Sequence, residues 1–369
     1  MINEMKYVPI LRWKQAERLA LRALNEEDRT RVTPLIELIP TIFKPRKQAG
    51  IPYAPDPTRV LDEEAKRLLE ACQYSPFFLD AGFVDRQVQG PSGKVPALEY
   101  LAATSRSYKM SVVPVTALSR SAEFQSSVAR VAKADGRGAC MRITPAEVLR
   151  PGFGSQMKDC LACLGLKPRS VHLIIDYEAN NPTTPDPVSV LAQVPDLAEW
   201  PTLCIAGGAF PPDLQEFQPG NWRIPRTEWL AWKRAISNGK NLRRKPNFSD
   251  YTIQYGLYKE PVDGCNPSVS VRYTLDEEWL IMRGEAARGK SGAKSLETRP
   301  GREQWNGHAQ LLCDSPDLFY GQHFSWGDRF IYQKSQNTRE PGTYEIWLRA
   351  GINHHITVVS RQIANLRVL

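Results

Sequence analysis

The stretch YVPILRWKQAERLALRAL, residues 7–24, contains the unit that decides the fold. A short apolar run, YVPILR, ends in a basic residue, and a segment with helical periodicity follows it. The same order recurs along the chain, and such alternation is typical of parallel strands joined by crossover helices. The unit therefore predicts an α/β fold.

Seven further apolar runs repeat this unit. They are TPLIEL (33–38), PFFLDAG (76–82), SVVPVT (111–116), ACMRI (139–143), VHLIIDYE (171–178), TLCIAGG (202–208) and YTIQYG (251–256). Between them, stripes such as Leu61, Ala65, Leu68 and Cys72 lay one apolar helix face on a sheet. Eight such strands predict a (β/α)8 TIM-like barrel, a fold that typically takes about 250 residues. The alternative is a doubly wound open sheet, but no glycine-rich turn follows the first strand.

The eighth strand is open to two interpretations. Besides YTIQYG, the run SVSVRYT (268–274) has a strong β pattern, and with DEEWLIMRG (276–284) it predicts a hairpin around Asp276 and Glu277. We expect residues 1–256 to form the barrel. Residues 257–369 would be a C-terminal extension that packs on the barrel or completes it, and its last apolar segment, INHHITVVSRQIANL, would be a helix or a strand.

Composition limits the class of protein. No run approaches the roughly 18 consecutive apolar residues of a membrane helix, and the N-terminal residues do not resemble a signal peptide, so we expect a cytoplasmic protein without a membrane partner. Seven cysteines, an odd number in mostly apolar surroundings, indicate reduced core thiols rather than a disulfide framework. The formal net charge of +8 favours anionic partners.

A Walker A pattern runs from Gly284 to Ser291, with Gly289 and Lys290 at the required spacing. A phosphate-binding loop of this kind needs a helix directly after it. The residues after Ser291, GAKSLETRPGREQ, contain Gly292, Pro300 and Gly301 and leave no room for one. The pattern therefore indicates a solvated basic loop.

The opening YVPILRWKQAE, followed by TPLIEL, resembles the so-called beta protein family of bacterial and phage genomes. Members share an opening of the type Y-x-P-I-L-x-W-K-Q-x-E and then T-P-L-I-E. The resemblance extends through IPRTEW (224–229), SVRYT with EEWLIMRG, and GINHHI (351–356). It implies an association with mobile elements and phage defence, and it supplies no catalytic residues.

Candidate site residues come from the carboxyl ends of the strands, where barrel enzymes place their sites. Glu37, Asp80 and Asp176 could bind Mg²⁺ or Mn²⁺, or act as catalytic acid and base. Lys14 and Arg142 suit a phosphate, and the amides of Gly207 and Gly208 could bind one too. Other polar residues at these ends are Arg12, Thr116 and Glu178. The alternative is that these charges pair with one another as a network that only closes the barrel top.

Two basic runs, GKNLRRKPNF (239–248) and RGKSGAKSLETRPGR (288–302), could bind nucleic acid, with Tyr251, Tyr255 and Tyr258 as stacking aromatics. The residues predicted to contact it are Arg243, Arg244, Lys245 and Lys290. Solvated loops are the alternative. None of the five histidines ends a strand, and His354 and His355 would face opposite sides of one, which disfavours a histidine-bound zinc site.

Two functions follow from these patterns. The first is an enzyme that binds a phosphorylated small molecule, nucleotide or nucleic acid and hydrolyses its phosphoester, assisted by a metal ion. The second is a non-catalytic module that senses nucleic acid or a phage protein and controls a partner protein encoded nearby.

Overall fold

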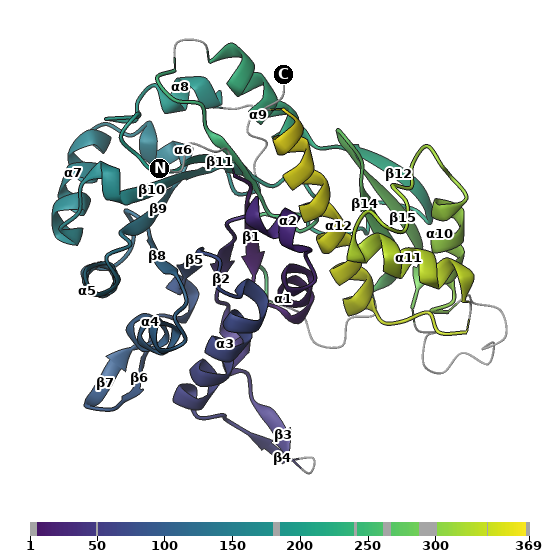
Figure 1. The fold of residues 1–369 in the computed structure, drawn as a ribbon, viewed down its shortest axis with the longest axis horizontal. Helices are drawn as coiled ribbons and strands as arrows, with labels where there is room; N and C mark the ends of the chain where they lie inside the picture. Colours follow the sequence, from purple (N-terminus) through teal and green to yellow (C-terminus); the bar gives the residue numbers. More distant parts are fainter. Residues whose placement is uncertain are drawn as a thin grey trace.

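Eight parallel strands close into a barrel (Figure 1) in a computed structural model that describes residues 6–48, 51–179, 185–239, 242–260, 267–287, 301–337 and 339–366. In order around the barrel they are β1 (Val8–Arg12), β2 (Leu35–Glu37), β5 (Phe77–Asp80), β8 (Val112–Thr116), β9 (Ala139–Ile143), β10 (Val171–Asp176), β11 (Leu203–Gly207) and β13 (Asn247–Asp250). The predicted (β/α)8 barrel is confirmed, and the open-sheet alternative is wrong.

Helices cover the outside of the barrel. They are α1 (Gln15–Arg22), α2 (Glu26–Thr30), α3 (Pro57–Cys72), α4 (Ala97–Ser107), α5 (Ala122–Asp135), α6 (Pro145–Val148), α7 (Phe153–Leu164), α8 (Pro187–Leu191) and α9 (Thr227–Asn238). The predicted stripe on α3 is buried, and the Asp56 side chain caps this helix by accepting from Thr58 N. The connections contain three short 3-10 turns and two hairpins. The turns are η1 (Pro40–Phe43), η2 (Gly82–Val84) and η3 (Pro168–Ser170), and the hairpins are β3–β4 (Arg46–Gln48, Ile51–Tyr53) and β6–β7 (Gln87–Gly90, Gly93–Pro96).

The eighth strand is neither of the two predicted runs. It is NFSD, β13, which pairs with β11 and β1 directly before YTIQYG. This strand is polar, so its apolar pattern is weak, and its polar groups are buried with specific partners. Ser249 Oγ donates to Val8 O at 2.6 Å, and Asp250 Oδ1 accepts from Thr252 N at 2.9 Å, which turns the chain out of the strand.

A second lobe contains a three-stranded antiparallel sheet in the order β12 (Gly220–Pro225), β15 (Glu278–Ala286) and β14 (Ser268–Thr274). Helices α10 (Gln304–Cys313) and α11 (Trp326–Gln336) pack beside it (Figure 1). The predicted hairpin of residues 268–284 is confirmed as β14–β15. The sheet also takes β12 from within residues 1–256, so the chain enters this lobe before it completes the barrel.

The long helix α12 (Tyr344–Asn365) lies between the barrel and the second lobe (Figure 1). It carries GINHHI, so that segment is a helix rather than a strand. His355 Nε2 lies 2.8 Å from Asp250 Oδ2, at the end of β13, and His354 Nδ1 lies 2.8 Å from Asp328 Oδ2, in α11. Both histidines are fully buried, so they join the barrel to the second lobe.

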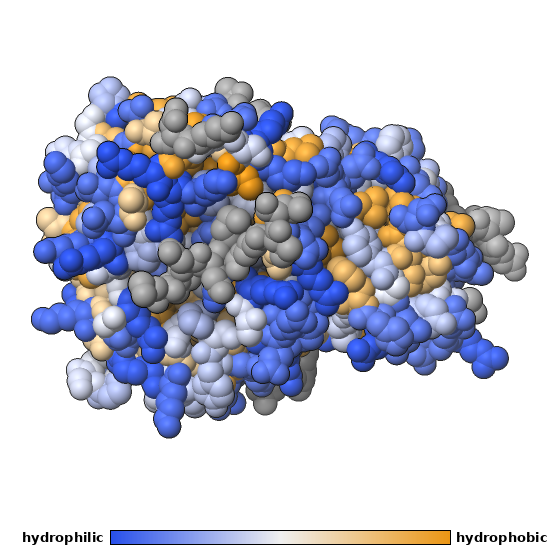
Figure 2. All heavy atoms as spheres, turned by 45° about the horizontal axis from the view of Figure 1, so that its top comes forward, coloured by the Kyte–Doolittle hydropathy of each residue, from blue (hydrophilic) through white to orange (hydrophobic). Residues whose placement is uncertain are grey.

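The surface is mainly hydrophilic on the face seen in Figure 2, where hydrophobic residues appear in small separate patches. The large exposed hydrophobic side chains, such as Ile51, Tyr74 and Leu311, come from different parts of the chain. In the described part of the chain, no helix combines the length and apolar character needed to span a bilayer.

Candidate active site at the barrel mouth

The side chains at the carboxyl ends of the strands point into the barrel because of the two-residue period of a strand. Ile10, Leu35, Phe78, Cys140 and Ile174 belong to the core inside the barrel. Two residues after each of them stands a charged residue: Arg12, Glu37, Asp80, Arg142 and Asp176. The predicted convergence of strand-end charges is therefore what the structure shows.

Arg142 lies at the centre of this cluster. Its Nε lies 2.6 Å from Asp176 Oδ2, and its Nη1 lies 2.6 Å from Glu37 Oε1 and 3.4 Å from Asp80 Oδ2. Its Nη2 donates to the hydroxyl of Tyr251 at 2.6 Å. Burial lowers the pKa of Arg142, but these four neighbours outweigh burial and raise it well above its ordinary value. The guanidinium is a permanent cation bound to three carboxylates.

A cavity of about 230 Å³ opens beside this cluster, and we call it the mouth cavity. Five carboxylates and two guanidinium groups line it, together with Phe83, Thr116, Ala117, Ser119, Ile143 and Thr144. The charged residues are Glu37, Asp80, Glu147, Asp176, Glu178, Arg120 and Arg142. The cavity is thus polar, with more acidic than basic groups.

Two buried oxygen atoms of the cavity lack hydrogen-bond partners. Thr116 is 1% exposed, and its hydroxyl bonds to nothing. Glu37 is 3% exposed, and its Oε2 accepts no hydrogen bond, although Arg12 Nε lies 3.5 Å away. Buried polar atoms without partners cost about 1–3 kcal/mol each, so such groups often mark a place where a ligand binds.

Glu178 stands at the edge of the cavity, just after β10. Burial and the neighbouring Asp176 raise its pKa, and Arg142 opposes them. Its backbone is held in the left-handed region, at φ 55°, because Glu178 N donates to Asp176 Oδ1 at 2.8 Å and Glu178 O accepts from Gly208 N at 2.7 Å. Such strained positions cluster at functional sites.

The loop after β13 closes one side of the mouth. Tyr251 donates its hydroxyl to Asp176 Oδ2 at 2.6 Å, and Arg12 Nη2 donates to Gly256 O at 2.6 Å. Gly256 lies so close to the backbone of Glu178 that an added Cβ would be 2.5 Å from its carbonyl. The sequence indicated Tyr251 only as a stacking aromatic, but the structure places it inside the site.

Arg120 and Glu147 were not predicted, since they lie beyond the ends of β8 and β9. Arg120 Nη2 lies 3.2 Å from Asp80 Oδ1, and its Nε is buried without a hydrogen-bond partner. Glu147 forms a capping box with Thr144 at the start of α6. The sequence signal for Glu147 was the T-x-x-E pattern directly after a strand. Arg120 had no such signal.

The predicted phosphate contacts do not gather in the cavity. Lys14 precedes α1 rather than lining the cavity, and it acts on Glu17, whose pKa burial raises to about 7 while Lys14 lowers it. Gly207 ends β11, and the amide of Gly208 is already bound to Glu178 O. Of these predicted contacts only Arg142 lines the cavity, with its donors in use.

The three predicted metal ligands, Glu37, Asp80 and Asp176, do meet at the mouth, but the guanidinium of Arg142 lies among them. Within the described residues, no group of three or more His, Cys, Asp and Glu side chains is arranged to hold a metal ion. Binding of Mg²⁺ or Mn²⁺ would have to displace Arg142, and it stays a prediction.

Residues 242–246 of the basic run lie at the opposite end of the barrel, directly before β13, and Asn247 and Phe248 belong to that strand. Arg244 donates to the backbone carbonyls of Trp200 and Pro201, the latter at 2.6 Å, so it is a structural residue. Arg243 and Lys245 are exposed. Lys290 lies outside the described residues. Nucleic-acid binding by these residues stays a prediction.

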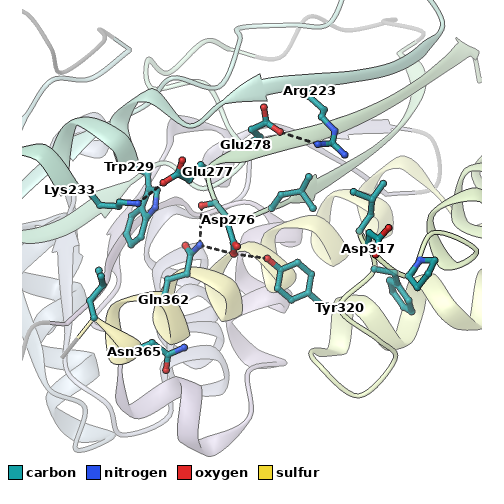
Figure 3. A pocket seen from close by; sticks show the side chains of 15 residues that line it. Arg223, Trp229, Lys233, Asp276, Glu277, Glu278, Asp317, Tyr320, Gln362 and Asn365 are labelled. Atoms are coloured by element: carbon teal, nitrogen blue, oxygen red, sulfur yellow. Dashed lines mark hydrogen bonds and ion pairs between the residues drawn. The ribbon is translucent and has the colours of Figure 1, made fainter. Parts of the chain in front are cut away.

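A larger groove of about 1,120 Å³ lies between α9, α12 and the second lobe (Figure 3). Most of its charged groups have partners. Arg223 Nη1 lies 3.4 Å from Glu278 Oε2, Lys233 bonds to Glu277, and Tyr320 donates to Asp276 Oδ1 at 3.1 Å. Among its described lining residues no buried polar side chain lacks a partner. Despite its smaller volume, the mouth cavity is therefore the stronger candidate site.

Comparison with solved structures finds weak likeness. Triosephosphate isomerase from Bartonella henselae has a TM-score of 0.35 and 10% identity, over 67% of this chain and 92% of the isomerase. A GH138 enzyme targeting pectin rhamnogalacturonan II has a TM-score of 0.38 and 10% identity, over 85% of this chain and 42% of that enzyme. Similarity at this level says nothing about the chemistry of this chain.

No curated protein sequence matches the chain significantly. The family model described as Beta protein matches residues 7–361, nearly the whole chain, which confirms the resemblance seen in the sequence motifs. The chain belongs to the Beta protein family.

Proposed function

We propose that the chain is an enzyme whose active site is the mouth cavity, and that it transfers a proton to or from a small polar substrate. Glu178 is the general acid or base. The observation that carries the proposal is that Glu178, with its raised pKa, shares the cavity with the buried, unpartnered hydroxyl of Thr116.

A raised pKa suits Glu178 to this role, since a general acid or base works best when its pKa approaches the pH of the reaction. Asp176 is different, because it accepts hydrogen bonds from Arg142, Tyr251 and the Glu178 amide. It holds the loop that carries Glu178. Glu178 thus transfers the proton, and Asp176 positions the backbone that carries it.

The volume of the cavity favours a small molecule. At about 230 Å³ it falls below the roughly 300–1,000 Å³ of pockets for drug-sized ligands. A nucleotide or a nucleic-acid strand fits such a space less well than a metabolite of a few carbon atoms.

A phosphate group has less support here than a neutral or cationic group. Carboxylates outnumber guanidinium groups around the cavity, and Arg142 donates through all three nitrogens to protein groups. Hydrolysis of a phosphoester, with or without a metal ion, therefore stays a prediction from the sequence. The same holds for an association with phage defence.

The test is to incubate the protein with mixtures of small polar metabolites and to follow their consumption by mass spectrometry. Glu178→Gln keeps the shape of the side chain and removes the titratable proton. Glu123→Gln, on the exposed first turn of α5, is the matched control. We expect a compound that the wild-type protein and the control consume at equal rates, and that Glu178→Gln consumes at least about 100-fold more slowly.

The proposal is wrong if Glu178→Gln consumes that compound at the wild-type rate. It is also wrong if the compound is consumed only after Mg²⁺ or Mn²⁺ is added and the Glu178→Gln variant responds equally. In that case the metal-assisted reaction predicted from the sequence is the better account.

A further inference from the structure

Two buried oxygen atoms of the mouth cavity accept no hydrogen bond from the protein. They are Glu37 Oε2, which has only the ion-pair contact with Arg12 Nε at 3.5 Å, and the Thr116 hydroxyl oxygen; both residues line the space. The donors of Arg142 are bound to Asp176, Glu37 and Tyr251. A ligand that bonds to these two oxygens therefore brings donors of its own.

The charge of the lining points in the same direction. Five carboxylates and two guanidinium groups line this small space, and Arg12 adds a third guanidinium 3.5 Å from Glu37, so negative charge remains in excess. Charges in such a space interact more strongly than they do in water, because the local dielectric constant is lower. The ligand best suited to this excess carries positive charge.

We infer that the substrate carries a positively charged amino group, which binds between Glu37 Oε2 and the hydroxyl of Thr116, beside Glu178. An ammonium group offers three donors and no acceptor, and so matches two unpartnered oxygens and a nearby carboxylate. The inference rests on the proposed function, whose site it shares, and it adds the substrate class.

A second feature of the ligand follows from Arg120. Its Nε is a buried donor without a hydrogen-bond partner, and the residue lines the same cavity. The substrate therefore also has an oxygen atom that accepts from this group. A small amino alcohol or amino sugar has both features. A phosphate ester supplies the acceptor but adds negative charge beside five carboxylates.

Matched ligand pairs test the inference. Serinol and glycerol differ by one amino group in place of a hydroxyl, as do glucosamine and glucose. Binding of each to the wild-type protein at pH 7 is measured by titration calorimetry, with glucose 6-phosphate as the anionic probe. We expect at least one amine to bind about 10-fold more tightly than its alcohol, since a charged hydrogen bond exceeds a neutral one by about that factor.

Two variants locate the binding. Glu37→Gln should abolish the preference for the amine, and Thr116→Val should weaken the binding of the amine about 10-fold. Because Glu37 also pairs with Arg142, a misfolded Glu37→Gln protein would give no answer. Thr116→Val removes a hydroxyl that bonds to nothing in the protein, so it keeps the inference testable.

The inference is overturned if each alcohol binds as tightly as its amine, if glucose 6-phosphate binds most tightly, or if Thr116→Val leaves amine binding unchanged. The proposed function fails separately. Amines that bind at Thr116 but are consumed equally by wild type and Glu178→Gln would keep the ligand class and remove the role of Glu178 in proton transfer.

Discussion

Replacing Thr116 by valine should make the protein more stable and less able to bind its ligand. The hydroxyl of Thr116 is 1% exposed and has no hydrogen-bond partner, so folding takes it out of water without compensation. That loss costs about 1–3 kcal/mol, and valine has nearly the same shape without the hydroxyl. We expect the free energy of unfolding of Thr116→Val to rise by about 1 kcal/mol.

Thr202→Val is the matched control. Thr202 is also buried, but its Oγ1 lies 2.9 Å from His172 Nδ1 in a hydrogen bond, directly before β11. The same substitution there removes a made bond and leaves the imidazole nitrogen without its partner. We expect a loss of about 1–2 kcal/mol.

The assay is urea unfolding at pH 7.5, followed by tryptophan fluorescence, for the wild-type protein and both variants. The midpoints should move in opposite directions, with similar slopes. If Thr116→Val destabilises the protein as much as Thr202→Val does, the hydroxyl has a partner that stabilises the fold. The argument that Thr116 is kept for a ligand would then be refuted.

Three further predictions concern the same end of the barrel and one histidine. Arg142→Met should lower the free energy of unfolding by about 3–5 kcal/mol, because it leaves buried carboxylates unpaired. Arg130→Met, at an exposed pair, should cost about 1 kcal/mol or less in the same urea assay. Gly256→Ala should lower the melting temperature, because the added Cβ would lie 2.5 Å from the Glu178 backbone. Gly154→Ala, in α7 with open space around it, should leave the melting temperature unchanged or raise it. Burial and Arg244 lower the pKa of His172 to about 4. Its contribution to stability is therefore lost as the pH falls from about 6.5 towards that value. His172→Gln should make the free energy of unfolding less dependent on pH in this range.

Each of these has a result that contradicts it. Equal midpoints for Arg142→Met and Arg130→Met would mean that the guanidinium at the mouth does not hold the carboxylates together. Equal melting temperatures for the two glycine variants would mean that the loop after β13 moves away from Glu178 without cost. A His172→Gln protein with unchanged pH dependence would mean that the imidazole has the same pKa in the folded and unfolded states.

The sequence predicted which side chains meet at the mouth but not how they pair. Glu37, Asp80, Arg142 and Asp176 each end an apolar run or stand within its last residues, so their convergence follows from the barrel alone. That Arg142 spans from β9 to Glu37 on β2 depends on the closure and register of the whole barrel, which no local pattern contains. These four residues pair with one another, as the alternative interpretation of the sequence predicted. Thr116, whose hydroxyl has no hydrogen-bond partner, lines the same cavity.

The eighth strand was missed for a related reason. Strand prediction from one sequence relies on apolar alternation, and NFSD has only Phe248 as a strongly apolar residue. Its stability as a strand comes from residues far away in the chain: Val8 accepts from Ser249, while Tyr7 and His355 bond to Asp250. Because polar partners replace hydrophobic burial in β13, only the assembled structure reveals it.

The net charge of the chain and the charge of the mouth cavity favour ligands of opposite charge. The formal charge of +8 predicted an anionic partner, yet the mouth cavity has an excess of carboxylates. Exposed charges are screened over about 10 Å at moderate salt. Arg243 and Lys245 precede β13, at the end of the barrel opposite the mouth cavity, so they act little on a ligand in that cavity. Carboxylates that line the cavity act at contact distance and with less screening. The charges that line the cavity therefore determine the charge of the ligand, and they favour a cation.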